Sequence, residues 1–231
     1  KYLKKFYLKS NTMINLLKIE WLKIKNYTAF IVMTLFFIVG VFALNYIVFT
    51  VNKNIVNNVP GAGLVSFSPY DFANTWQSTS YATGFILLLP ALLLLMLFTN
   101  EYTFKTHRQN IIDGLSRQQF ISVKIMMALI FAMAATLLVI ISALIFGFGS
   151  GTAFSLNGFI FVGYFFLKAL SYNLIAILFS VLVKRTGFAI GIFFIYLGSE
   201  NIVSQLLNVL SMKLKRENGT DLGNIGDYLP M

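Results

Sequence analysis

The chain has 231 residues, of which 58% belong to the apolar and aromatic set AVILMFWYC and only 11% are charged. Soluble domains carry about 25% charged residues, so this chain has too few charges to cover a water-exposed surface. The composition excludes an ordinary cytosolic enzyme, a disordered chain and a coiled coil, and it predicts an all-α integral membrane protein forming a single transmembrane domain over 1–231. The net charge of +10 suits cytoplasmic loops and anionic lipid, and the scattered basic residues do not predict nucleic-acid binding.

The residue inventory argues against catalysis within this chain. It contains no cysteine and a single histidine, His107, which excludes a thiolate or multi-histidine metal site. No Gly-Lys pair and no HExxH motif occur, so neither a Walker A loop nor a zincin site is present. We therefore expect no catalytic residue, no metal site and no cofactor in this chain.

The first predicted element is an interfacial helix over 13–26. Apolar residues recur there at helical spacing, at Ile14, Leu17, Trp21 and Ile24, among several lysines. A basic helix with a Trp is typical of a segment that lies in the cytoplasmic membrane interface.

Five long apolar runs follow, and each reaches the roughly 20 residues that a helix needs to cross the hydrocarbon core. They are 28–49, 81–99, 120–148, 158–183 and 187–207. They lack period-two alternation, which argues against membrane-spanning strands.

The loop charges predict the orientation. Seven lysines precede the first run, whereas the 50–80 loop holds only Lys53 and the 100–119 loop holds three basic residues. The positive-inside rule therefore predicts a cytoplasmic N-terminus, an outer loop at 50–80 and a cytoplasmic loop at 100–119. Lys213, Lys215 and Arg216 conflict mildly with this topology, which places them outside.

Three residues inside the apolar runs stand out. Pro90 lies within the second run, where a proline frees a carbonyl and predicts a helix kink. Lys168 and Glu200 fall at similar depth in the two last runs, which the short turn at 184–186 makes antiparallel neighbours. They are candidates for an intramembrane ion pair, for a lining of the substrate path, or for a lysine that snorkels and a glutamate in an outer loop.

The 100–119 loop carries the most informative pattern. We expect a short helix over 102–112, with Glu101 near its N-terminus and Gly114 ending it. Ser116 and Gln119 predict a capping box that starts the next helix. The alternative is a solvated basic turn that merely follows the positive-inside rule.

At these residues the sequence resembles the permease subunits of type-2 ATP-binding cassette transporters, including bacitracin-resistance, lantibiotic-immunity and sodium-extrusion permeases. The resemblance rests on Asn100-Glu101-Tyr102, Thr106, Arg108-Gln109-Asn110, Asp113-Gly114-Leu115-Ser116-Arg117, Phe120 and Lys124. The opening segment 17–23 resembles that family's elbow helix, and 184–187 resembles the turn that begins its fifth span. Such permeases have six spans, so the resemblance implies that the sixth is missing from a truncated C-terminus after 227–230.

The resemblance implies that the loop is the coupling region that docks on a separate ATPase subunit. The residues assigned to coupling are Glu101, Phe104, Arg108, Ile111, Ile112, Gly114, Ser116 and Arg117. ATP and Mg would be bound by that partner, and this chain would work as a homo- or heterodimer in the bacterial cytoplasmic membrane, in contact with lipid.

The expected function is that of the permease of an ATP-driven exporter, which moves substrate by alternating access. The alternative is a self-contained secondary transporter or channel, although no internal repeat is visible.

Overall fold

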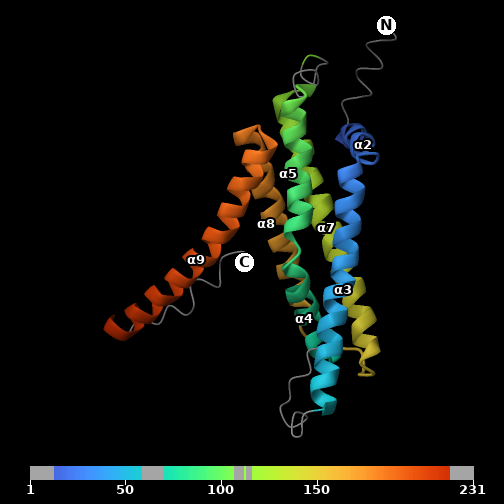
Figure 1. The fold of residues 1–231 in the computed structure, drawn as a ribbon, viewed down its shortest axis with the longest axis vertical. Helices are drawn as coiled ribbons and strands as arrows, with labels where there is room; N and C mark the ends of the chain where they lie inside the picture. Colours follow the sequence, from blue (N-terminus) through green and yellow to red (C-terminus); the bar gives the residue numbers. More distant parts are fainter. Residues whose placement is uncertain (1–12, 59–69, 107–111, 113–115, 219–231) are drawn as a thin grey trace.

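The computed structural model describes residues 13–58, 70–106, 112 and 116–218. Within these ranges the chain forms helices and no strand (Figure 1). The helices are α2 (Met13–Ile24), α3 (Thr28–Asn58), α4 (Phe72–Gly84), α5 (Leu88–Thr103), α7 (Arg117–Gly149), α8 (Ile160–Val183) and α9 (Thr186–Asn218).

Four of these helices, α3, α7, α8 and α9, are long and apolar enough to cross a membrane. A fifth span arises if α4 and α5 are counted together, since they form one apolar segment bent by 42°. The prediction of an all-α membrane protein with an N-terminal helix is thus confirmed for the described residues. The segment 227–230, after which the sixth span was expected to be missing, lies outside the described residues.

The broken span follows from Pro90, which lies in the first turn of α5. Its missing N–H leaves the Ile86 carbonyl without the usual helical donor, and the Leu89 N–H bonds that carbonyl instead, at 3.0 Å. The preceding residues form similarly tight turns, from Phe85 to Ala82 and from Ile86 to Thr83. The kink predicted at Pro90 therefore lies just before it, at 85–87. Helix also occupies 72–80, a part of the chain that the sequence assigned to the outer loop.

Small residues bring the central helices close together. Ala128, Ala132 and Ala135 of α7 and Ala169 and Ala176 of α8 are all at most 2% exposed. Membrane helices approach closely through such residues, because lipid offers no hydrophobic drive between them. The core therefore lies between α5, α7 and α8, with α3 packed against α5 and α7.

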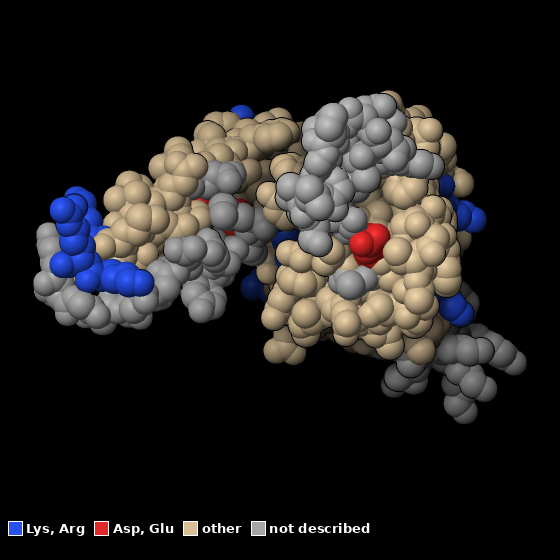
Figure 2. Space-filling view, turned by 90° about the horizontal axis from the view of Figure 1, so that it is seen from below, with Lys and Arg blue, Asp and Glu red and all other residues tan. Residues whose placement is uncertain are grey.

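The bundle has two ends that differ in chemistry, which we call the α2 end and the α4 end (Figure 1). α2 caps one end, where α5 finishes and α7 and α9 begin. Figure 2 views the molecule from the α4 end, where most of the described surface is uncharged. α9 starts beside α5 and α8 at the α2 end and diverges from them along its length.

The side of α2 that packs on the bundle overlaps the predicted stripe only in part: Ile24 is buried and Leu17 packs beside it. Its buried residues are Leu16, Glu20 and Ile24, whereas Ile14 and Trp21 are exposed. The apolar periodicity did not identify this buried side, because it includes a charged residue, Glu20; the interfacial position predicted for the helix stays a prediction.

Candidate functional site

Three charged side chains meet at the α2 end, one from each of three helices. The Lys124 ammonium of α7 lies 2.5 Å from Glu101 Oε1 of α5 and 3.3 Å from Glu20 Oε2 of α2. Lys23 adds a second, more exposed cation 3.1 Å from Glu20 Oε1. We call Glu20, Glu101 and Lys124 the charge cluster.

The charge cluster is buried. Lys124 is 3% exposed, and its ammonium also lies over the rings of Phe98 and Phe120, at 4.3 and 5.0 Å from their centroids. Such cation–π contacts are strongest where water is excluded. Leaving a buried charge without its partner costs much more free energy than a surface ion pair contributes. Because separating any of the three side chains would leave such a charge, they must move together or not at all.

Glu101 does not start a helix, which corrects the expected start of the short helix over 102–112. Thr106 and Ile112 are helical, and 107–111 lie outside the described residues. α5 continues through Thr103, so Glu101 lies in its last turn, and Lys105 then ends the helix in a left-handed conformation with φ 57°. A carboxylate is unfavourable at a helix C-terminus because it faces the negative end of the helix dipole. The sequence pattern missed this because Glu101 is stabilised by Lys124, 23 residues away.

Electrostatics favours the ionised form of Glu20. Burial alone raises its pKa, but the positive charges of Lys124 and Lys23 outweigh burial, so the pKa of Glu20 lies below its ordinary value of 4.5. The cluster therefore holds α2 to the bundle at neutral pH through an ionised carboxylate.

Asn100 makes a second, uncharged link at the same end. Its Nδ2 donates to the Tyr27 hydroxyl at 2.9 Å, between α2 and α3, and its Oδ1 accepts from the Thr186 hydroxyl at 3.4 Å, at the start of α9. Together, Asn100 and Glu101 connect the end of α5 to α2, α7, α9 and the α2–α3 junction.

The residues assigned to coupling are placed as follows. Glu101 belongs to the charge cluster, while Phe104 and Ile112 are exposed, at 73% and 83%. The Ser116 capping box is confirmed: the Gln119 N–H donates to Ser116 Oγ at 3.2 Å, and the Ser116 N–H donates to Gln119 Oε1 at 3.0 Å. Arg117 is the first residue of α7. Arg108, Ile111 and Gly114 lie outside the described residues.

Lys168 and Glu200 are not joined by a hydrogen bond or an ion pair within the described part of the chain. The Lys168 ammonium instead approaches the α4–α5 break, 3.4 Å from the position of a Cβ built on Gly84, and lies 5.8 Å from the Tyr172 ring. Glu200 is 5% exposed, and its Oε1 makes no hydrogen bond. Their pairing stays a prediction.

A neutral polar network holds the α4 end. Asn45 of α3 is fully buried; its Oδ1 accepts from the Tyr70 hydroxyl at 3.1 Å, and its Nδ2 donates to the Val41 carbonyl at 2.8 Å and to the Thr83 hydroxyl at 3.3 Å. Trp76 Nε1 donates to the Ser155 carbonyl at 2.8 Å, which ties α4 to the α7–α8 connection.

Sequence reasoning left Glu20, Lys124 and Asn45 out of the site. Each carried a signal: Glu20 is the lone acid among the lysines of 1–26, and Lys124 and Asn45 interrupt apolar runs. An isolated charge or amide in an apolar run predicts a buried polar partner, although the sequence does not say which residue supplies it. No group of His, Cys, Asp or Glu suited to a metal ion occurs among the described residues.

Comparison with known proteins identifies the family. Residues 16–199, about four fifths of the chain, match the family model described as ABC-2 family transporter protein. No curated protein and no solved structure matches the chain. The family match confirms the resemblance to type-2 ATP-binding cassette permeases, and with the apolar helices it shows a multi-pass membrane protein. The chain belongs to the ABC-2 family of transporter proteins and is a transmembrane permease.

Proposed function

We propose that this chain is the permease subunit of an ATP-driven exporter and that its partner ATPase docks at the α2 end, on the segment 101–117. The observation that carries the proposal is the charge cluster. It joins Glu101, the first residue of this segment, to Lys124, seven residues after its end, and both of them to α2.

The segment also presents apolar side chains to a partner. Phe104, the residue that follows α5, and Ile112, further along the segment, are largely exposed. Exposed large apolar side chains that are not embedded in the bilayer mark interaction surfaces. A groove on an ATPase that accepts these two side chains would bury them.

The charge cluster gives a docked partner a mechanical connection to the spans. Displacing the segment would pull on Glu101 and on α7, and neither can move alone without leaving a buried charge unpaired. The motion would pass to α2 through Glu20 and to α9 through Asn100 and Thr186. ATP and Mg would bind the partner, and hydrolysis there would switch a homo- or heterodimer of permeases between inward and outward states.

The orientation of the molecule follows from the same proposal. An ATPase works in the cytoplasm, so the α2 end would face it, in agreement with the basic residues of α2, 105–117 and 184–185. The bacterial cytoplasmic membrane is the compartment that fits such an exporter.

Replacing Gly114 by Val tests the coupling role. Gly114 is expected to adopt a left-handed turn that a β-branched residue disfavours. We expect membrane insertion and partner binding to persist while substrate no longer stimulates ATP hydrolysis in proteoliposomes. Gly163→Val in α8 is the control, because no atom lies within 4 Å of a Cβ built there. Full substrate-stimulated hydrolysis in the Gly114→Val variant would contradict the proposal.

A self-contained secondary transporter is the second candidate, favoured by the broken α4–α5 span with Lys168 at its break. Secondary transporters place substrate sites at such discontinuous helices. Transport by the purified chain in vesicles that hold an ion gradient but neither ATPase nor ATP would establish this candidate. Transport that requires both ATPase and ATP would exclude it.

A further inference from the structure

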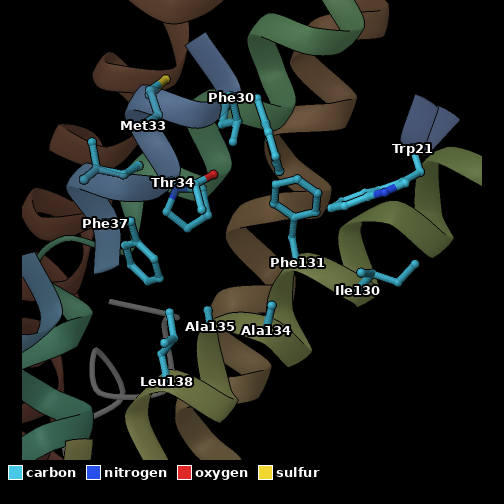
Figure 3. A pocket seen from close by; sticks show the side chains of 13 residues that line it. Trp21, Phe30, Met33, Thr34, Phe37, Ile130, Phe131, Ala134, Ala135 and Leu138 are labelled. Carbon is cyan, nitrogen blue, oxygen red and sulfur yellow. The ribbon is translucent and has the colours of Figure 1, made fainter. Parts of the chain in front are cut away.

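An apolar cavity of about 260 Å³ opens between α3, α5 and α7 near the α2 end. Figure 3 shows Trp21, Phe30 and Phe131 at one side of this cavity and Phe37 and Leu138 at the other. The polar atoms of its lining side chains are the Thr34 hydroxyl and the indole nitrogen of Trp21. Apolar cavities of this kind stay free of water and take up apolar ligands.

The cavity exists because three lining positions carry small or rigid residues. Ala134 and Ala135 of α7 and Pro90 of α5 all line the cavity, and their short side chains leave the space between α3, α5 and α7 unfilled. The floor is buried, with Phe37 and Leu93 at most 5% exposed, whereas Ala134 and Ile130 on the rim are exposed. The rim residues belong to an apolar span, so the cavity opens toward lipid rather than water.

The cavity runs inward from the membrane interface. Its residues on α3 extend from Phe30 to Phe37, which corresponds to a depth of roughly 10 Å along the helix. Trp21 of α2 stands at its outer end, 5.8 Å from the Phe30 ring and roughly edge-on to it. A Trp on an amphipathic helix is typical of the level of the lipid headgroups.

Two lysines flank Trp21 on the same side of α2. Lys18 precedes Trp21 by three residues and Lys25 follows it by four, so helical geometry places all three side chains on one face. The Lys25 N–H bonds the Trp21 carbonyl at 2.9 Å, which continues the helical turn. Both ammonium groups are exposed, and neither forms an ion pair among the described residues.

We propose that this cavity binds one acyl chain of an anionic phospholipid from the leaflet on the α2 side, with the headgroup held by Lys18 and Lys25. The acyl chain fits the dry, apolar, lipid-facing cavity, and the two lysines at its mouth complement a phosphodiester headgroup. The lipid would thereby contact α2, α3, α5 and α7 at once, beside the charge cluster. This inference does not depend on the proposed ATPase partner.

Trp21 is itself a reporter of the site, because the chain contains only one other Trp, Trp76. In a Trp76→Phe variant reconstituted in vesicles, we expect phosphatidylglycerol with brominated acyl chains to quench Trp21 more strongly than brominated phosphatidylcholine. Each lysine near the surface contributes about 1 kcal/mol toward anionic lipid, so the preference should be roughly 30-fold in relative binding constant. Bulk lipid around the helices quenches Trp21 equally with either headgroup. The difference in quenching between the two lipids therefore reports binding at the site.

Two variants separate the cavity from the charges. Ala134→Phe fills the cavity and should abolish the preference, while Leu137→Phe, on the exposed α7 surface outside the cavity, should keep it. The Lys18→Gln/Lys25→Gln variant should bind both lipids alike, whereas Lys213→Gln/Arg216→Gln removes two charges at the far end of α9 and should change nothing.

Equal quenching by the two lipids in the Trp76→Phe protein would overturn the proposal and would indicate an uncharged apolar occupant. An Ala134→Phe variant that keeps the full preference would overturn it as well. If Trp76→Phe does not fold, native mass spectrometry of the unmodified chain provides the same test: phosphatidylglycerol retained after detergent exchange must be lost in Ala134→Phe and kept in Leu137→Phe.

Discussion

The two ends of the bundle are held together by different chemistry. At the α2 end, one buried lysine joins two carboxylates from separate helices. At the α4 end, uncharged groups connect the helices. Asn45, Tyr70 and Thr83 form a hydrogen-bond network. The Phe72 ring packs against the rings of Trp76, Phe148 and Phe154.

Under the proposed function, this difference assigns the transmission of force to the α2 end. A neutral hydrogen bond contributes about 1 kcal/mol and can exchange partners, whereas a buried ion pair penalises any motion that separates its members. The charge cluster therefore behaves as one rigid unit across α2, α5 and α7. The α4 end resists deformation through packing and short hydrogen bonds instead.

Lys124→Met tests the α2 end and should have the largest effect. It leaves the Glu20 and Glu101 carboxylates buried without their shared cation, which should lower the free energy of unfolding by about 3–5 kcal/mol. Denaturant unfolding in detergent micelles measures this loss. Adding Glu101→Gln should recover part of it, because one of the two orphaned charges is then removed. A loss within about 0.5 kcal/mol, the range of ordinary surface substitutions, would contradict the assignment.

Gly147→Ala tests the packing of the α4 end. A Cβ there would lie 2.8 Å from the Phe72 ring, which is 1% exposed and has little room to shift. We expect a loss of about 1–3 kcal/mol in the free energy of unfolding, as for other overpacked cores.

The matched control is Gly149→Ala, where the nearest atom, on Phe49, is at an ordinary 4.0 Å. Phe72→Leu in the Gly147→Ala background should relieve part of the strain. Equal effects at Gly147 and Gly149 would show that the Phe72 contact does not restrain this end.

The free energy of unfolding should depend on pH differently at the two ends, with smaller effects than those of the substitutions above. Glu20 has a lowered pKa, so its contribution to stability is present above its ordinary value of 4.5 and is lost as the pH falls through the lower folded value. Burial raises the pKa of Tyr70 above its ordinary value of 10, so its contribution is present below pH 10 and declines as the pH rises beyond it.

Unfolding measured as a function of pH should therefore show an acid loss that Glu20→Gln removes and an alkaline loss that Tyr70→Phe removes. One pH unit above 10, the loss from Tyr70 should be about 1 kcal/mol. Acid and alkaline limits that are unchanged in these two variants would contradict the assignments.

Local sequence features accounted for the long apolar helices and for the Ser116 cap, but not for the first part of α4 or for long-range polar pairing. Hydropathy located the spans, and the Ser116–Gln119 capping box was readable because its two residues are three apart. Glu101 was misplaced at a helix start because its partner Lys124 lies in another helix. The sequence predicted only a kink at Pro90 and not α4 before it. The start of α4 is held by Thr152 and Ser155, which are remote in sequence, and by the Tyr70 carbonyl just before the helix.

Cysteine cross-linking tests most directly whether the α2 end is the side on which the ATPase docks, and the absence of cysteine from the chain makes single-site labels unambiguous. Ile112→Cys places a thiol on the exposed side chain of the proposed docking segment, and Gln77→Cys places one on the exposed surface of α4. With the cognate ATPase in proteoliposomes, a short bifunctional cross-linker should join the Ile112→Cys variant to the ATPase and leave the Gln77→Cys variant unlinked. Cross-linking from Gln77→Cys and none from Ile112→Cys would contradict the account.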